Sequence, residues 1–198
     1  MSAEQITNAT YDLIAASYAE RYWKMSLDHT LQRFAEAVKA GGRVLDLGCG
    51  PGRDVALLNE RGFDTIGIDR SRGMLAEARQ RVSKAFICAD MRRIPLASAS
   101  VDGIWMCASL FHISRPDVPS VLDEVHRILT TNGVLFISVR QGNGDEWSDS
   151  DGGLRYFTLF QLEELLGLLA QAKFAIKQHS LDAFGHSTWI SVLSECDK

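Results

Sequence analysis

The sequence predicts a single α/β domain in which helices cover both faces of a doubly wound, mostly parallel β-sheet. Short β-rich apolar runs alternate with helical runs five times along the chain, and this alternation is typical of a parallel sheet with crossover helices. The chain has 198 residues, of which 46% are hydrophobic and 23% charged. These values fit one folded domain, 1–198, and exclude a disordered or collagen-like chain.

The first forty residues (1–40) predict two helices that precede the sheet. Aliphatic and aromatic side chains recur through a helix-compatible stretch up to Tyr22, and a second stretch places apolar residues three and four positions apart. The second stretch carries Leu27, Leu31, Phe34, Ala35 and Val38. The glycine pair at 41–42 is expected to end it.

Residues 43–47 predict the first buried strand, which runs directly into a glycine-rich turn and a helix that closes at Gly62. The second strand covers 65–68 and ends at Asp69. Ser71 follows at the position where a hydroxyl caps the next helix.

The next elements continue the alternation. A third strand covers 85–88, and a fourth covers about 101–107. A helix over about 116–130 carries one clean apolar stripe, and a fifth strand follows at 134–139.

The C-terminal part departs from this alternation. Residues 141–153 are polar and predict a long loop, after which Thr158 and Gln161 have capping-box spacing and open a helix. Two last strands are expected around 174–179 and 187–193. The segment between them is too short for a parallel crossover, so these two strands should be antiparallel neighbours.

Composition and charge favour a cytoplasmic protein. The formal net charge of −4 gives no strong general attraction to nucleic acid. The longest runs without a charged residue have twelve residues, whereas a spanning helix needs about 20, and no signal peptide is visible. The four cysteines (Cys49, Cys88, Cys107 and Cys196) form no CxxC pair, so we expect reduced core thiols and no metal site.

Chemistry-bearing residues follow three successive strands. The run Gly48-Cys49-Gly50-Pro51-Gly52 lets the chain turn sharply and approach a ligand. Asp69, at the end of the second strand, is placed to accept both ribose hydroxyls of an adenosine. Asp90, after the third strand, is placed to accept from an adenine amino group. Because parallel strands end at one edge of the sheet, the set predicts a site for an adenosine-containing ligand.

Two details disfavour a dinucleotide as that ligand. The third glycine of the turn comes one residue earlier than in the G-x-G-x-x-G pattern that receives a pyrophosphate. Asp46 also places a carboxylate behind the turn, and an acid there suits an ammonium group better than a diphosphate.

At this point the sequence resembles the class I S-adenosylmethionine-dependent methyltransferases. The resemblance rests on five segments, 46–52, 67–71, 88–91, 101–105 and 129–135, and covers about 10–195. In the last segment Asn132 stands where a glycine is common, a mild departure because Asn tolerates the left-handed region. The resemblance implies a Rossmann-like, seven-stranded sheet with the last strand antiparallel and inserted beside the fifth.

The resemblance also implies the site residues. S-adenosyl-L-methionine would be the cofactor and S-adenosyl-L-homocysteine the product, and the segment 1–40 would cover the cofactor. The implied cofactor-binding residues are Tyr11, Tyr18, Arg21, Asp46, Gly48, Gly50, Gly52, Asp69, Arg70, Met74, Asp90, Met91, Cys107, Ala108 and Phe111. The expected chemistry is in-line displacement at the cofactor methyl, in which the protein mainly positions the reactants.

His112 is the candidate general base because it follows the fourth strand near the expected methyl position; the alternative is a packing or loop histidine. The polar loop over 141–157 is expected near the acceptor, with Trp147, Arg155 and Tyr156 as candidate acceptor contacts. We expect a small-molecule acceptor, whose identity and methylated atom the sequence does not reveal.

Three alternatives stay open at this stage. The basic residues within 70–93 would suit a tRNA- or RNA-modifying methyltransferase, although no aromatic residues interleave with them. An NAD-dependent oxidoreductase would share the sheet, and a non-catalytic nucleoside-binding module would lack an acceptor pocket. The chain is expected to be a monomer or a homodimer.

Overall fold

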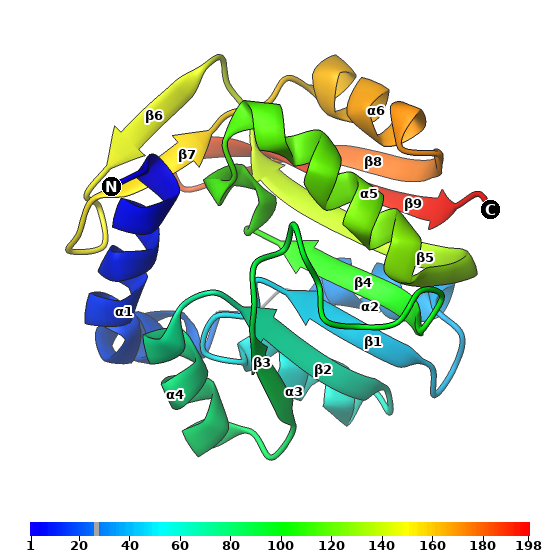
Figure 1. Cartoon of the computed structure of the whole chain (residues 1–198), viewed down its shortest axis with the longest axis horizontal. Coiled ribbons are helices and arrows are strands. Elements are labelled where there is room, and N and C mark those ends of the chain that lie inside the picture. Colours follow the sequence, from blue (N-terminus) through cyan, green and yellow to red (C-terminus); the bar gives the residue numbers. More distant parts are fainter. Residues whose placement is uncertain (26–27) are drawn as a thin grey trace.

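A seven-stranded sheet runs through the centre of the protein (Figure 1), whose computed structural model describes residues 1–25 and 28–198. The strand order is β3-β2-β1-β4-β5-β9-β8. The strands are β1 (Arg43–Leu47), β2 (Asp64–Asp69), β3 (Ala85–Cys88), β4 (Val101–Cys107), β5 (Leu129–Arg140), β8 (Phe174–Phe184) and β9 (Ser187–Cys196). A separate pair is formed by β6 (Asp145–Ser148) and β7 (Arg155–Thr158).

The strand directions confirm the predicted mixed sheet. The neighbours among β1 to β5 pair in parallel, whereas β9 lies antiparallel between β5 and β8. The carboxyl ends of β1, β2, β3 and β4 therefore meet at one edge, where open α/β sheets bind ligands. Within the parts of the chain that the structure describes, no helix combines the length and the hydrophobicity that crossing a bilayer requires.

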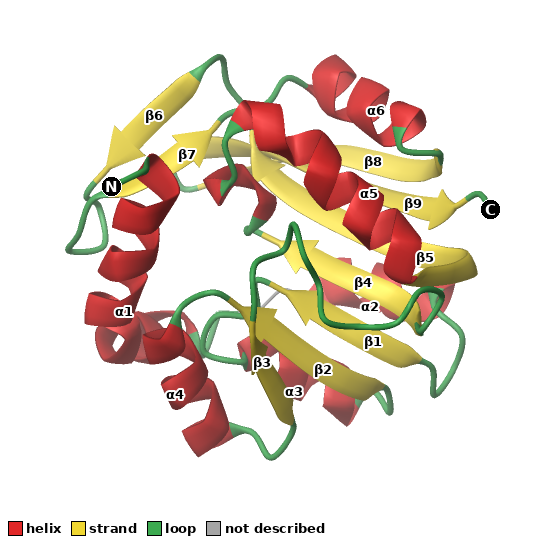
Figure 2. Cartoon of the chain, in the orientation of Figure 1, coloured by secondary structure: helices red, strands yellow, loops and turns green. Residues whose placement is uncertain are grey.

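Helices cover both faces of the sheet (Figure 2). They are α1 (Ala3–Tyr22), α2 (Asp28–Ala37), α3 (Arg53–Glu60), α4 (Arg72–Arg81), α5 (Val118–Ile128) and α6 (Leu162–Gln171), with short 3-10 turns at Leu110–His112 and Arg115–Asp117. α5 and α6 pack on one face, and α2 and α3 on the other. α1 stands apart from these layers and crosses the edge where the parallel strands end.

Apolar packing explains why the two layers form. α5 buries the whole stripe that its sequence predicts, Val118, Val121, Leu122, Val125 and Ile128. On the opposite face, Trp105 of β4 stacks on Phe136 of β5 with ring centroids 4.2 Å apart. The indole nitrogen of Trp105 donates to the carboxylate of Asp54 at 2.9 Å, so its polar atom is satisfied inside the core.

The segment predicted as a polar loop is instead a β-hairpin. Residues of β6 pair antiparallel with β7, and Trp147 stands opposite Tyr156 with their rings 5.5 Å apart. Short strands with polar, half-exposed side chains carry no clear alternation of hydrophobicity, so the loop prediction for 141–157 was wrong. A consequence is that Arg155 is buried rather than exposed.

Several predicted boundaries also shift. The helix α6 is capped by Gln161 with Glu164, while Thr158 ends β7 and donates its hydroxyl to the carbonyl of Ile113. The fifth strand begins at residue 129, five positions earlier than predicted. The last two strands are longer than predicted, because backbone pairing continues up to a turn at 185–186.

Three smaller predictions have mixed outcomes. Asn132 adopts φ of 61°, a left-handed value that Asn tolerates, although it lies within β5 and not in a turn between helix and strand. Cys88 is exposed, contrary to the prediction of a core thiol, because it ends the edge strand β3. Leu27, which the sequence assigns to the second helix, lies outside the described residues.

Candidate functional site

A cavity of about 360 Å³ opens at the carboxyl edge of the parallel strands, beneath α1. It is lined by the turns that follow β1 to β4, by β5 and β9, and by the inner side of α1. It brings together most of the site residues predicted from sequence: Tyr11, Tyr18, Gly48, Gly50, Asp69, Arg70, Met74, Asp90, Met91, Cys107, Ala108 and His112. Its volume lies within the usual range of small-molecule sites, about 300–1,000 Å³.

The glycine turn forms the floor of the cavity. Gly48 has φ of 83°, and a Cβ added there would lie 2.3 Å from the Cβ of Ser109, so a larger residue does not fit. Gly50 has φ of 51°. Gly52 also has a positive φ of 84° but packs against Ala78 and Phe86, behind the cavity wall. The turn therefore exposes backbone to a ligand.

Asp46 lies directly behind the glycine turn. Its side chain is buried, and Oδ2 has no hydrogen-bond partner within the protein. Burial, and secondly the neighbouring carboxylate of Asp54, raise the pKa of Asp46 well above its usual value. A buried carboxylate without a partner is costly, so a cationic group placed nearby would be strongly favoured.

Asp69 sits at the tip of β2 and faces the cavity. Its carboxylate accepts from the backbone N–H of Gly50 at 2.8 Å and of Ser71 at 2.7 Å. Burial raises its pKa above the usual value, and these backbone hydrogen bonds oppose that rise. Each carboxylate oxygen has a second lone pair, so Asp69 can still accept from two hydroxyl groups.

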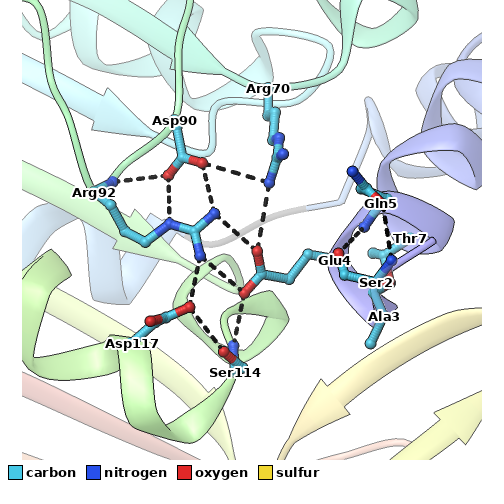
Figure 3. A network of polar contacts seen from close by, with 10 residues as sticks. All are labelled: Ser2, Ala3, Glu4, Gln5, Thr7, Arg70, Asp90, Arg92, Ser114 and Asp117. Atoms are coloured by element: carbon cyan, nitrogen blue, oxygen red, sulfur yellow. Dashed lines mark hydrogen bonds and ion pairs between the residues drawn. The ribbon is translucent and has the colours of Figure 1, made fainter.

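Asp90, which the sequence presents as a free acceptor, is part of a charged network (Figure 3). Arg92 donates hydrogen bonds to both of its carboxylate oxygens, from Nη2 to Oδ2 at 2.7 Å and from Nε to Oδ1 at 3.0 Å. Burial raises the pKa of Asp90, but hydrogen bonds from Arg92 outweigh it and the pKa is lowered. Glu4 of α1 joins the network, 2.9 Å from Arg92 and 3.4 Å from Arg70, and Asp117 lies 2.6 Å from Arg92.

Sequence reasoning missed Glu4 and Arg92 in this network. Glu4 is separated by many residues from both arginines and reaches them because α1 crosses the ends of β2 and β3. Asp90 keeps little free acceptor capacity, since Oδ1 also accepts from the backbone N–H of Arg92 at 2.9 Å.

The other end of the cavity is aromatic and polar. The hydroxyl of Tyr11 and Nε2 of His112 are 2.7 Å apart, and Nδ1 of His112 lies 2.8 Å from the carbonyl oxygen of Tyr156. A carbonyl only accepts, so Nδ1 carries the proton and Nε2 accepts from Tyr11. Burial lowers the pKa of His112 to about 3, so its imidazole is neutral.

Arg155 and Asp151 stand behind Tyr11. Nη1 of Arg155 donates to the Tyr11 hydroxyl at 3.2 Å, and Nη2 pairs with Asp151. Asp151 also accepts from the hydroxyl of Tyr22 at 2.8 Å and from Arg21 at 2.7 Å. This cluster ties both the middle and the end of α1 to the β6–β7 hairpin.

Several predicted site residues do not line the cavity. Arg155 and Tyr156 belong to the hairpin behind Tyr11, and the largely exposed Arg21 points to Asp151. Phe111 is buried in the core beside α5, and Trp147 is 46% exposed on β6. The sequence pattern did not give the direction in which each of these side chains points.

Other lining residues were missed because they come from the far strands. They are Phe136 and Ser138 of β5 with Asp182, Ala183, Phe184, Trp189 and Ser191 of the β8–β9 hairpin. Ser138 and Ser191 are directly opposite each other in the antiparallel register. A serine within each otherwise apolar strand was the one feature of the sequence that could have indicated that these strands line the cavity.

Within 1–25 and 28–198, no group of three His, Cys, Asp or Glu side chains could hold a metal ion.

The end of β4 shows how the chain turns into this site. Ala108 has φ of 57°, an uncommon value for a residue with a side chain, and its N–H donates to the carbonyl of Ser138 at 3.0 Å. Ser109 then donates its hydroxyl to the carbonyl of Leu47 at 2.7 Å. These bonds hold Cys107 and Ala108 against the glycine turn, and such local strain is typical of functional sites.

Comparison with known proteins shows similarity to methyltransferases. Residues 45–137 match the family model described as a methyltransferase domain. A malonyl-acyl-carrier-protein O-methyltransferase of Laribacter hongkongensis is 33% identical over 144 residues, which cover 66% of this chain and 46% of that protein. The chain spans about half the length of the curated relatives it matches.

Two solved structures share the architecture. A Burkholderia thailandensis 1,6-didemethyltoxoflavin N1-methyltransferase with bound S-adenosylhomocysteine has a TM-score of 0.78 and 18% identity, over 98% of this chain and 88% of that one. The cyclase SpnF has a TM-score of 0.80 and 18% identity, over 100% of this chain and 97% of that one. These likenesses concern the fold, and the cyclase illustrates that one fold hosts different reactions.

The glycine turn, the carboxylates at the ends of β1 and β2, the domain match and the shared fold agree with one another. Residues 45–137 of this chain are similar to a methyltransferase domain, and the chain has the fold of solved S-adenosylmethionine-dependent methyltransferases.

Proposed function

We propose that this protein transfers a methyl group from S-adenosylmethionine to a small-molecule acceptor by in-line displacement. The observation that carries the proposal is the order of groups around one cavity. The glycine turn after β1 and the carboxylates after β2 and β3 line the cavity, and the buried Asp46, whose Oδ2 has no hydrogen-bond partner, lies behind the turn.

The residues present fit this cofactor. Asp46 would compensate the ammonium group of its methionine part, because Oδ2 is buried and has no partner in the protein. Gly48 and Gly50 would lie beneath that part, and Asp69 would accept from the ribose hydroxyls. Met91 and Asp90 would flank the adenine.

When bound, S-adenosylmethionine supplies a methyl group already activated by its positive sulfonium. The protein then has to orient that methyl group and exclude water. Cys107 and Ala108 at the end of β4 would hold the methyl end, and Tyr11 and Tyr18 of α1 would close the cavity above it. Orientation of this kind is worth about 7–11 kcal/mol of a barrier in well-aligned systems.

The basic residues of 70–93 support a small-molecule acceptor over RNA. Arg70 and Arg92 are held by Glu4 and Asp90, and Arg79 donates to the carbonyl of Phe86 at 2.9 Å. Arg81 pairs with Glu77. Four of the seven basic residues of this segment therefore already have partners within the protein, which leaves fewer of them for phosphate groups. We also propose a cytoplasmic location, which suits four cysteines that are free thiols.

The proposal is tested by calorimetric titration with S-adenosylhomocysteine and, separately, with NAD. We expect binding of S-adenosylhomocysteine and none of NAD. Asp69→Ala should weaken the binding by about 1–3 kcal/mol, because hydrogen bonds to a charged group are lost. Asp64→Ala, at the exposed start of the same strand, is the matched control and should bind as the wild type does.

Preferential binding of NAD would overturn the proposed function. Equal affinity of Asp69→Ala and Asp64→Ala for S-adenosylhomocysteine would overturn the ribose assignment while leaving the cofactor in place.

A further inference from the structure

We infer that Tyr11 binds the hydroxyl group of an uncharged, flat acceptor and passes the acceptor's proton on to His112. This inference rests on the proposed methyl transfer and adds to it the acceptor class and a route for the proton. Tyr11 would be the catalytic residue, and His112 would be the proton acceptor that acts through it.

The hydrogen bonds of Tyr11 leave room for one more partner. Its oxygen donates to Nε2 of His112 at 2.7 Å and accepts from Nη1 of Arg155 at 3.2 Å. A phenolic oxygen has two lone pairs, so it can accept one further hydrogen bond. Both Tyr11 and His112 line the cavity, and a hydroxyl of an acceptor is the natural donor to the remaining lone pair.

The orientation of both side chains is fixed by packed surroundings. The ring of His112 is in contact with those of Phe111 and Phe157, at centroid distances of 4.5 and 4.8 Å. Arg155 lies 5.4 Å from the Tyr11 ring centroid and pairs with Asp151. A hydrogen-bonded pair held in this way is positioned before any ligand enters.

The proton transfer balances in atoms and charge. The acceptor oxygen bonds to the methyl carbon while the carbon–sulfur bond breaks and its electron pair goes to sulfur. The acceptor's proton moves to the Tyr11 oxygen, and the proton of Tyr11 moves to Nε2 of His112. One positive charge disappears at the sulfonium and one appears at His112, so the net charge of the cavity does not change.

The chemistry of this pair favours a hydroxyl over an amine. Burial lowers the pKa of His112 to about 3 and raises that of Tyr11 to about 12. The groups facing the imidazole are the Tyr11 hydroxyl and the Arg155 cation. A weak base of this kind can accept a proton from a hydroxyl group whose oxygen is being methylated, because methylation makes that O–H strongly acidic. It does not accept one from an alkylammonium group, whose pKa is near that of lysine, about 10.

Charges on the cavity wall disfavour an anionic acceptor. Arg53 pairs with Asp54 at 2.6 Å, and Arg70 with Glu4 and Asp90. Among the described residues that line the cavity, each arginine thus already has a carboxylate partner. A carboxylate or phosphate would therefore find no unpaired arginine on the described part of the wall to offset its desolvation cost.

The remaining wall suits a flat ring. Phe136 and Trp189 contribute aromatic surface from β5 and β9, and Phe184 from the end of β8. Tyr18 packs edge-on against Tyr11, with centroids 5.6 Å apart. An aromatic ring gains from such edge and face contacts, and its hydroxyl would then meet the Tyr11 oxygen.

The test uses the full chain saturated with S-adenosylhomocysteine and three probes of equal ring size. Calorimetry measures the dissociation constants of 4-methylphenol, 4-methylanisole and 4-methylbenzoate. We expect the phenol to bind about tenfold more tightly than the anisole, which has no proton to donate, and the benzoate to bind most weakly. Tyr11→Phe should remove the preference for the phenol.

A second readout separates proton transfer from positioning. With S-adenosylmethionine and 4-methylphenol, His112→Gln should lower the transfer rate about 100-fold or more while the phenol dissociation constant changes little. The glutamine oxygen can still accept from Tyr11 but does not take up its proton. His126→Gln is the matched control, because His126 lies on α5 with Nε2 3.3 Å from the Asp197 carbonyl.

The outcomes distinguish this inference from the proposed function. If the wild type does not bind S-adenosylhomocysteine, the proposed function fails. The inference alone fails if the loaded protein binds the phenol and the anisole equally, or prefers the benzoate. It also fails if Tyr11→Phe keeps the phenol preference, if the wild type transfers no methyl to the bound phenol, or if His112→Gln transfers at the wild-type rate.

Discussion

The helices α1 and α5 are attached to the same sheet by different forces. α5 buries five apolar side chains in its eleven residues, whereas α1 buries only Thr7, Thr10, Ile14, Ala15 and Ala19 in twenty. α1 is instead fastened by polar groups along its length, from Glu4 at one end to Tyr22 at the other. α5 is therefore part of the core, whereas α1 covers the cavity and is held mainly by polar contacts.

The middle of α1 is also held by polar contacts. Thr10 donates its hydroxyl to the carbonyl of Leu154 at 2.7 Å, and Thr7 accepts from the N–H of Tyr156 at 2.9 Å. Asp12 accepts from the hydroxyl of Ser71 at 2.7 Å. Polar contacts of this kind are directional, so they place α1 accurately over the cavity with little apolar burial.

The largest expected effect comes from the apolar helix. Leu122→Ala on α5 should lower the free energy of unfolding by about 2–5 kcal/mol, because a fully buried leucine leaves a cavity behind. Leu13→Ala on α1 is the matched control, and its side chain is 83% exposed, so we expect a change within about 0.5 kcal/mol. Denaturant unfolding measures both variants. An equal loss of unfolding free energy in the two variants would contradict the view that α5 belongs to the core and α1 does not.

An intermediate effect should appear as pH falls. Because burial lowers the pKa of His112 to about 3 from its usual 6.5, the folded protein binds fewer protons than the unfolded chain between these values. The contribution is fully present above pH 6.5 and is lost as pH drops toward 3. At pH 5 the loss amounts to about 2 kcal/mol.

Unfolding curves at pH 7 and pH 5 for the wild type, His112→Gln and His126→Gln measure this effect. We expect a smaller pH dependence in His112→Gln only. If His126→Gln, and not His112→Gln, reduces the pH dependence of the unfolding free energy, then the buried His112 beside α1 is not its cause.

The smallest expected change in stability comes from the charged end of α1. Glu4→Gln should cost about 1 kcal/mol or less, because the ion pairs with Arg70 and Arg92 are partly exposed to solvent. Hydrogen exchange in α1 should nevertheless speed up, and that in α5 should not. Glu20→Gln, at an exposed position of the same helix, is the control. Unchanged exchange in α1 of Glu4→Gln would show that the network does not fasten the helix.

The fold was largely predictable because its signals are local. The alternation of apolar runs and the glycine turn predict β1 to β5, and a short connection predicts that β8 and β9 are antiparallel neighbours. The β6–β7 hairpin was not predictable in this way. Its strands are short and half-exposed, and they are stabilised by contacts with α1, such as the bond between Thr7 and the Tyr156 N–H.

The site was predictable only in part for a related reason. Positions at strand tips identify Asp46, Asp69 and Asp90 from the order of elements alone. The partners of these groups come from distant segments, as Glu4 does for Arg92, and a sequence contains no signal for such a contact. The role of Tyr11 likewise emerges only once His112 and Arg155 are brought beside it.

Hydrogen exchange with and without saturating S-adenosylhomocysteine tests the central claim most directly, since it reports on the cavity and on its cover together. We expect slower exchange in α1 and in the turns that follow β1, β2 and β3, with exchange in α5 unchanged. Protection confined to the β8 edge, or no protection in α1 despite binding, would contradict a cofactor held beneath that helix.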